Sequence, residues 1–256
     1  MRRLALFVCL LLPAAAAAQS SNELAVFSAG NLTPVAGLPP IMTSSISGRV
    51  QRSVQFGMRY GYLAQERREA ELPRGQVDVN NFAVTAVLPM GLGATVSITG
   101  GVSSPTCSDC DPGLMLSLGG DMRLTEFPFG PTEDAARFTV TVNGEFGFGK
   151  PKLPLRILST AWAGSVGVPI GYLTSGHNGG MRIVTFVTPA LVFGATDFED
   201  NIPGFPGSES GARFMIGGGV GIFNAKSPIM LNVGAQYIAI ENGGAQIGVA
   251  LIFGGR

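Results

Sequence analysis

The residue types that most often perform chemistry in proteins are scarce in this chain. Its single histidine, His177, lies in the glycine-rich stretch 174–180. Ser175 is two residues away, which suggests a nucleophile and its base, but a glycine-rich turn gives such a pair no rigid support. One histidine also cannot build a histidine-based metal cluster. We therefore expect a solvated loop histidine, no enzymatic activity, and no cofactor or metal.

Cys107 and Cys110 form a C-x-x-C pair, and they are the only cysteines after residue 18. In a cytosolic protein this spacing is typical of redox or metal chemistry. Zinc would need two further ligands, and the neighbouring Asp109 and Asp111 are awkwardly placed to supply them. In an exported protein the same pair predicts a small disulfide that closes a loop.

Four charged residues, Arg59, Asp121, Arg123 and Glu145, lie among small residues in segments that alternate in polarity. If these segments are strands of one barrel, the four side chains project into its lumen. Each charge there must pair or meet water, because a buried and unpaired charge is costly. Two interpretations stay open: a salt-bridged plug, which we prefer, and the lining of a narrow polar passage.

The composition excludes several classes of protein. The chain of 256 residues is 46% hydrophobic but only 13% charged, whereas a typical soluble domain carries about 25% charged residues. Disordered chains need more charge and fewer large apolar side chains. Lys and Arg total 17, as do Asp and Glu, so there is no basic excess that would favour nucleic-acid binding.

The segment 1–18 has the layout of a secretory signal peptide. Arg2 and Arg3 precede an apolar core at 4–12, and the alanines of 14–18 provide a small-residue cleavage site. The core is shorter than the ~20 residues that a membrane-spanning helix needs. A retained membrane anchor is the alternative interpretation.

The rest of the chain alternates in polarity with a period of two, which is typical of strands with one apolar face. In 92–102, for example, Leu92, Val96 and Ile98 share one face, and small or polar residues share the other. Pro189 cannot donate a ladder hydrogen bond, so we expect it at an edge, a bulge or a strand end. The pattern predicts about ten strands, with eight to twelve possible, at 55–62, 77–88, 92–102, 114–124, 137–148, 157–170, 182–195, 212–223, 229–240 and 246–253. The parity of the first strand continues backward to residue 46.

Three features favour a membrane barrel over a soluble sheet. The polar faces carry small residues, which suits a narrow barrel interior. Phe138 and Phe148 are ten residues apart on one strand, or roughly 23 Å along the membrane normal, close to the ~25 Å between aromatic girdles. The connections also tend to alternate between short and long, although 125–136 and 171–180 are long for inner turns.

The chain resembles the bacterial outer-membrane β-barrel family in three features. These are its signal peptide, its ten alternating segments, and a last strand at 245–253 with an aromatic residue near its end. It departs from the family pattern in continuing past Phe253 with three more residues. The resemblance implies an all-β, antiparallel, up-and-down transmembrane barrel in the bacterial outer membrane. It also implies insertion by the barrel-assembly machinery and contact with outer-membrane lipid and lipopolysaccharide.

We therefore expect a signal peptide at 1–18, an irregular lead-in at 19–40 and a β-barrel at 41–256. The expected function is that of a non-enzymatic integral envelope protein, either structural or a narrow, plugged channel related to porins. Two alternatives stay open: an outer-membrane enzyme acting on lipid or peptide, and a soluble secreted β-sandwich that serves as a binding module.

Overall fold

The computed structural model describes most of the expected barrel domain, beginning at Val54. The expected signal peptide, the lead-in, Cys107, Cys110 and His177 all lie outside the described residues. The described residues are 54–66, 76–91, 93–106, 111–131, 135–152, 158–174, 180–198, 208–224, 227, 229–239 and 244–254. Within these ranges no helix is long and apolar enough to cross a membrane.

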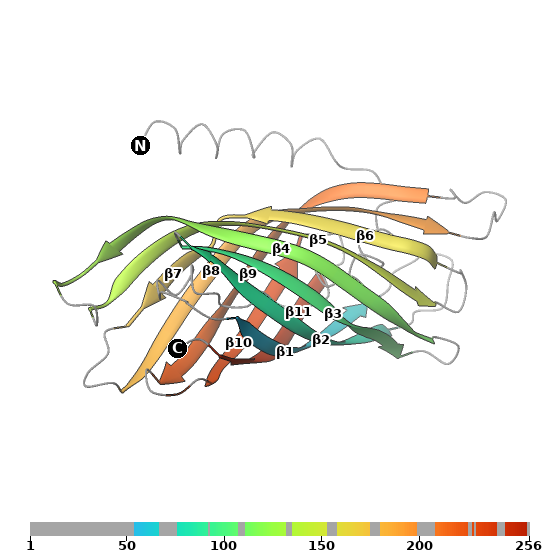
Figure 1. Ribbon diagram of the computed structural model, residues 1–256. Helices are drawn as coiled ribbons and strands as arrows, with labels where there is room; N and C mark the ends of the chain where they lie inside the picture. Colours follow the sequence, from blue (N-terminus) through green and yellow to red (C-terminus); the bar gives the residue numbers. More distant parts are fainter. Residues whose placement is uncertain are drawn as a thin grey trace.

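The described residues form eleven β-strands that wrap obliquely around one barrel (Figure 1). Neighbouring strands in the wall pair antiparallel, and the last strand returns to pair with the first. This confirms the predicted all-β, antiparallel barrel. The strands are β1 (Gln55–Glu66), β2 (Gln76–Gly91), β3 (Ala94–Thr106), β4 (Asp111–Pro128), β5 (Arg137–Lys152), β6 (Leu158–Gly167), β7 (Ile170–Leu173), β8 (Met181–Phe198), β9 (Ser208–Asn224), β10 (Ile229–Ile238) and β11 (Gly244–Phe253).

Strands β6 and β7 together occupy one position in the wall, so the barrel has the ten strands that the alternation predicted. Both pair with β5 on one side and with β8 on the other, without an inserted residue. The interruption falls at Pro169, which has no N–H to donate. Backbone bonds from Val168 to the Pro189 carbonyl (3.0 Å) and from Thr141 to the Pro169 carbonyl (2.9 Å) hold the wall together there.

Pro189 was expected at an edge, a bulge or a strand end, and that expectation was wrong. It lies well inside β8, level with the interruption between β6 and β7. The two prolines therefore weaken the ladder at the same place in the wall.

The strand pairing also sets the tilt and width of the barrel. Phe148 is linked through paired positions on β4, β3, β2, β1, β11, β10 and β9 to Ile183 of β8. In the other direction it is linked through Trp162 to Ala195 of β8. The shear number is the difference between these two positions of β8, 195 − 183 = 12. Ten strands with this shear tilt by about 40° and form a wall of roughly 10 Å radius.

Side chains alternate between the lumen and the outer face along the strands, except at a bulge in β4 between Arg123 and Thr125. In β5, Thr139 and Thr141 are buried inside, while Phe146 and Phe148 are exposed outside. The faces of β8 were unclear from sequence, and the structure places Val184 and Phe186 inside and Phe193 outside. The short β2–β3 turn requires glycine, because Gly91 and Gly93 have φ values of 80° and 76°.

Candidate functional site

Two of the four charged residues singled out from the sequence act on each other inside the barrel. Arg59 of β1 is only 6% exposed, and the negative charge of Glu145 of β5 acts on its guanidinium. Glu145 also accepts a hydrogen bond from Ser117 of the neighbouring strand β4, at 2.5 Å. A Cβ at Gly119 would lie 3.2 Å from Glu145 Cγ, so this glycine leaves the space that the carboxylate side chain occupies.

The other two, Asp121 and Arg123, lie two residues apart on the inner face of β4. Thr95, directly opposite Asp121 on β3, donates a 2.8 Å hydrogen bond to its carboxylate. Arg123 lies next to Gly93 of the β2–β3 turn, at the mouth of the barrel at which β1 begins and β11 ends. Asp121 is thus bound by Thr95, and Arg123 contacts Glu126 at the mouth.

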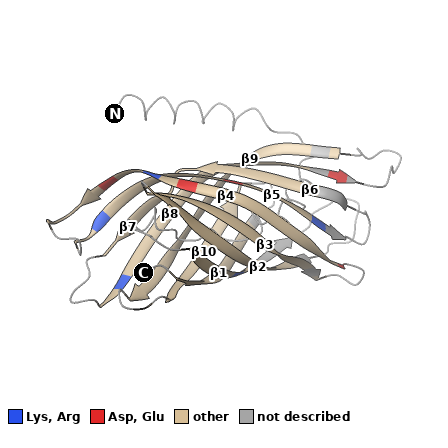
Figure 2. Cartoon of the chain, viewed as in Figure 1, with Lys and Arg blue, Asp and Glu red and all other residues tan. Residues whose placement is uncertain are grey.

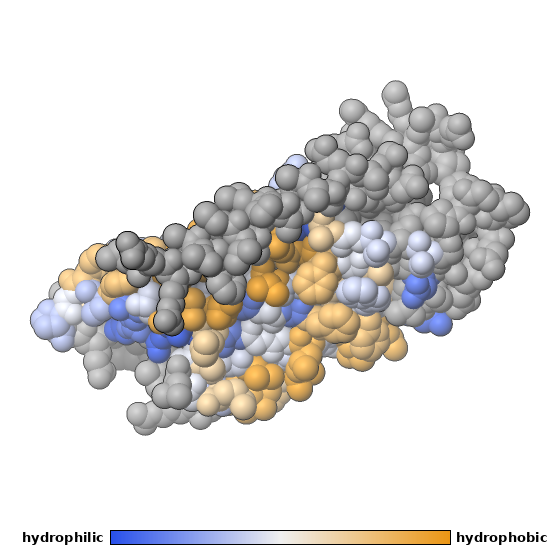
Figure 3. Space-filling view, turned by 90° about the horizontal axis from the view of Figure 1, so that it is seen from above, coloured by the Kyte–Doolittle hydropathy of each residue, from blue (hydrophilic) through white to orange (hydrophobic). Residues whose placement is uncertain are grey.

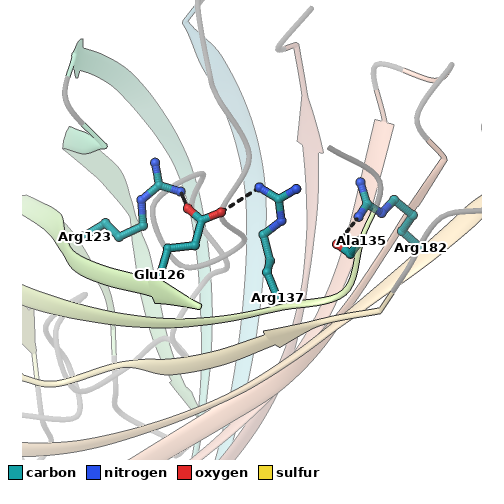
Figure 4. Close-up of polar contacts among 5 residues, drawn as sticks. All are labelled: Arg123, Glu126, Ala135, Arg137 and Arg182. Atoms are coloured by element: carbon teal, nitrogen blue, oxygen red, sulfur yellow. Dashed lines mark hydrogen bonds and ion pairs between the residues drawn. The ribbon is translucent and has the colours of Figure 1, made fainter. Parts of the chain in front are cut away.

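At that mouth, Glu126 bridges two arginines, as Figure 4 shows. Its carboxylate accepts hydrogen bonds from Arg123 at 2.5 Å and from Arg137 of β5 at 2.7 Å. The three side chains are only 15–25% exposed. We call Arg123, Glu126 and Arg137 the mouth triad. Charge-assisted bonds of this kind, partly shielded from water, are stronger than surface ion pairs.

Glu126 was missed by sequence reasoning because a β-bulge changes the direction in which it points. Up to Arg123, which pairs with Thr141, the strand follows its alternation. The register then shifts, so that Thr125 pairs with Val140 and Glu126 with the inward-facing Thr139. Without this extra residue, Glu126 would point to the outer face beside Leu124. Bulges of this kind turn a side chain to the other face of a sheet.

A third arginine ties the β4–β5 connection to the same mouth. Arg182 of β8 is 7% exposed, and it donates hydrogen bonds to the carbonyls of Thr174 (3.3 Å) and Ala135 (3.4 Å). The connection is also closed on itself by a 2.8 Å bond from the Phe129 N–H to the Ala136 carbonyl. Figure 4 shows Arg182 reaching Ala135 beside the mouth triad.

The lumen also has an apolar wall that the sequence did not reveal. One cluster of buried side chains lies near the mouth on β7 to β11, and a second lies farther along the lumen on β8 to β10. Between them, Gln236 and Gln246 share a 2.6 Å hydrogen bond. The clusters comprise Leu173, Val184, Phe186, Phe223, Met230 and Ile252, and then Ala190, Val192, Met215 and Ile238.

The outer face carries a continuous apolar band. The path of paired positions that defines the shear passes only through outward apolar residues and one glycine. Orange side chains gather over the described part of the face in Figure 3, and most of the strand length in Figure 2 carries no charge. A closed ten-stranded barrel that is apolar outside and carries charges inside has the architecture of a membrane-spanning β-barrel. The fold is that of a bacterial outer-membrane β-barrel.

Comparison with known proteins gives structural matches of low identity and low TM-score. No family model and no curated protein matches the chain. Among solved structures, the transport unit of the autotransporter AIDA-I from Escherichia coli is 12% identical over 93% of this chain and 100% of that one, with a TM-score of 0.35. The translocator domain of the autotransporter NalP from Neisseria meningitidis is 10% identical over 92% and 98%, with a TM-score of 0.39.

A third match is Ail, the attachment invasion locus protein of Yersinia pestis, solved in complex with the heparin analogue sucrose octasulfate. It is 11% identical over 79% of this chain and 99% of that one, with a TM-score of 0.28. At these identities and TM-scores, none of the three assigns a function to the outer-membrane-type barrel described here.

Aromatic side chains mark both edges of the apolar band of this barrel. At the end of the barrel opposite the mouth, which we call the loop end, Trp162 contacts Phe146 and Phe193, with ring centroids 5.8 and 6.4 Å apart. Near the mouth, Tyr172 contacts Phe129 at 6.2 Å. Trp162 and Tyr172 belong to the same wall position, on β6 and β7. At a tilt of about 40°, the rise of the chain between them corresponds to roughly 25 Å along the barrel axis, the height of a transmembrane apolar band.

Two of the predicted sites lie outside the described residues, namely His177 and the pair Cys107 and Cys110. Within the ranges that the structure describes, no three His, Cys, Asp or Glu side chains come together as a metal site would require.

The disulfide between Cys107 and Cys110 stays a prediction. We expect one disulfide per chain in protein purified without reductant, and we expect the barrel to survive its reduction, because the closed loop is too short to contribute much stability. Mass spectrometry after alkylation, with and without reductant, measures this. Two alkylated thiols in the unreduced sample would show that the pair is free.

Proposed function

We propose that this protein is an integral barrel of the bacterial outer membrane whose lumen is closed at rest. It would serve as a structural envelope component or as a narrow, gated channel. The observation that carries the proposal is the burial of Arg59 inside a barrel with an apolar outer band. A wide, water-filled pore would expose this guanidinium on the lumen wall, whereas it is 6% exposed beside the charge of Glu145.

The partners follow from the two faces of the wall. The apolar band would contact lipid, and the loop end would face lipopolysaccharide, because both ends of the barrel chain meet at the opposite mouth, where short turns are expected. Export through a cleaved signal peptide and insertion by the barrel-assembly machinery are part of the proposal. Phe253 supports it, since this aromatic faces outward at the end of β11 and pairs with Phe56.

We propose a non-enzymatic role, because the two inner glutamates are held by neighbouring side chains. Glu145 is bound by Ser117, and Glu126 is bound by two arginines. A general base or nucleophile must instead be available to a substrate. An outer-membrane enzyme acting on lipid or peptide stays the alternative, and turnover of such substrates by the purified barrel would favour it.

Single-channel recording in planar bilayers tests the closed lumen. We expect the unaltered protein to be nearly silent and Glu145→Ala to show openings, because Arg59 then loses the charge that acts on it. Lys150→Ala is the matched control: Lys150 is exposed on the outer side of the same strand, so its removal should leave the barrel silent. A large, steady current from the unaltered protein would refute the proposal.

A further inference from the structure

A row of polar side chains crosses the inner wall from the mouth toward the loop end. It begins beside Arg123 on β4, which pairs with Thr141 on β5. It ends with Gln236 on β10 and Gln246 on β11, which pair with each other. Between them, Thr188 on β8 is buried on the inner face at the interruption between β6 and β7. We call Thr141, Thr188, Gln236 and Gln246 the polar row.

The strand pairing shows that the row is continuous. The N–H of Thr141 donates a 2.9 Å hydrogen bond to the carbonyl of Pro169, and Pro169 lies level with Thr188, because the register of β8 continues from β6 into β7. Gly217 on β9 pairs with Thr188 on one side and with Gln236 on the other.

The row also advances along the barrel axis. It visits β4, β5, the position shared by β6 and β7, β8, β9, β10 and β11, which is six steps between neighbouring strands. At a strand spacing of about 4.8 Å and a tilt of about 40°, six steps advance roughly 18 Å along the axis. The row therefore follows most of the ~25 Å height of a transmembrane band.

The row separates the two apolar clusters of the lumen. On β8, Thr188 lies between Phe186 of the cluster near the mouth and Ala190 of the second cluster. On β10, Gln236 lies two residues from Ile238 of the second cluster, and the first cluster lies farther toward the mouth. Packing alone would favour an apolar residue at these positions, because a buried hydroxyl or amide needs a hydrogen bond.

Two hydroxyl groups of the row have no hydrogen-bond partner in the part of the chain that the structure describes. Thr141 and Thr188 are 0% and 2% exposed, and the Oγ1 atom of each is buried and unbonded. The Oδ1 atom of Asn143 is in the same state beside them. It lies 2.7 Å from the point that a Cβ on Gly167 would occupy, so this glycine leaves the amide its space. Buried polar atoms of this kind are expected to bind water or another small polar molecule.

The chemistry of the row favours molecules without charge. Its hydroxyl and amide groups both donate and accept hydrogen bonds, so they can replace the hydrogen bonds that a molecule loses when it leaves water. None of the four side chains carries a charge, and apolar clusters border the row on β8 to β10. An ion on this path would lose its hydration without a compensating charge, which is costly.

We propose that the polar row is the route by which water and small uncharged molecules with hydrogen-bonding groups cross the lumen, while ions are excluded. Such a molecule exchanges hydrogen bonds with the hydroxyls of Thr141 and Thr188 and with the amides of Gln236 and Gln246. The inference deepens the proposed narrow channel and rests on it, because the lumen is then closed to ions only.

Glycerol uptake by proteoliposomes tests this route. The full protein is refolded into liposomes, and light scattering after an osmotic step gives the rate of uptake. We expect faster uptake than in protein-free liposomes. Thr188→Val should slow the protein-dependent part about fivefold, the usual effect of one lost hydrogen bond. The fold should survive this change, because the Thr188 hydroxyl bonds to no described part of the protein. Thr141→Val should act in the same way and serves as the second variant.

Thr99→Val is the matched control. Thr99 is 1% exposed on the inner face of β3, outside the row, and its hydroxyl is bonded to that of Thr85 at 2.8 Å. The same loss of a hydroxyl there should leave the uptake of glycerol unchanged.

Three results would overturn the inference. Uptake no faster than in protein-free liposomes would remove the route and leave the barrel closed to ions, as the separate current measurement shows. Unchanged uptake in both Thr188→Val and Thr141→Val, with barrels that migrate as folded on an unboiled gel, would place the path away from the row. A steady ionic current through the unaltered protein would contradict the exclusion of ions, and only this last result would also refute the closed lumen.

Discussion

Replacing Ile98 with lysine should lower the free energy of unfolding in lipid bilayers by about 2–4 kcal/mol, the cost of a cation at the midplane of the lipid face. Ile98 is 52% exposed on the outer face of β3. It lies midway between Ala94 and Val102, and its paired neighbour Leu118 is exposed to the same side. Urea titration of the protein refolded into liposomes measures the change.

Ser97→Lys is the control, because the adjacent residue points into the lumen. Ser97 lies against Gly119, as does Glu145, so a lysine there has a carboxylate within the same region of the lumen. We expect a loss well below that of Ile98→Lys. An equal loss at both positions, or a larger one at Ser97, would reject the assignment of the outer face of β3 to lipid.

Replacing Glu126 with glutamine should destabilise the barrel by about 2–3 kcal/mol. A fully buried pair that loses one partner costs about 3–5 kcal/mol, and the partial exposure of the mouth triad places the expected loss below that range. The physical reason is that Arg123 and Arg137 would both lose the carboxylate between them. Two like charges would then face each other at the mouth. Unfolding in urea again gives the change in free energy.

A double-mutant cycle separates this effect from loss of packing. Arg137→Gln alone should be destabilising, but adding it to Glu126→Gln should cost little more, because the bond between them is already absent. Strict additivity of the two changes would show that Glu126 and Arg137 do not act as a pair.

The architecture could be predicted from the sequence because alternation is a local property. In a segment such as 137–148, small or polar residues alternate with large apolar ones. This alternation assigns the two faces of the strand without any information about the strands that pair with it. The number of wall positions followed from counting these runs. The split at Pro169 did not change that count, because β6 and β7 remain in one register.

The inner contacts could not be predicted in the same way, because they depend on how strands are paired. Arg123 and Glu126 are three residues apart, and simple alternation puts them on opposite faces. Only the register shift against β5 brings both inside. Arg182 was missed for a related reason: the faces of β8 could not be assigned, because apolar residues occur on both of them.

The seam between β1 and β11 has a consequence for how the barrel assembles. Phe56 pairs with Phe253, so the contacts that complete the wall join the two ends of the barrel chain and are among the most distant in the sequence. Contacts of such long range form slowly. Until they form, each terminal strand presents a row of unpaired N–H and C=O groups, which hydrocarbon does not tolerate. Folding rate should therefore depend most steeply on substitutions along this seam, and the open intermediate should be the state most prone to aggregate.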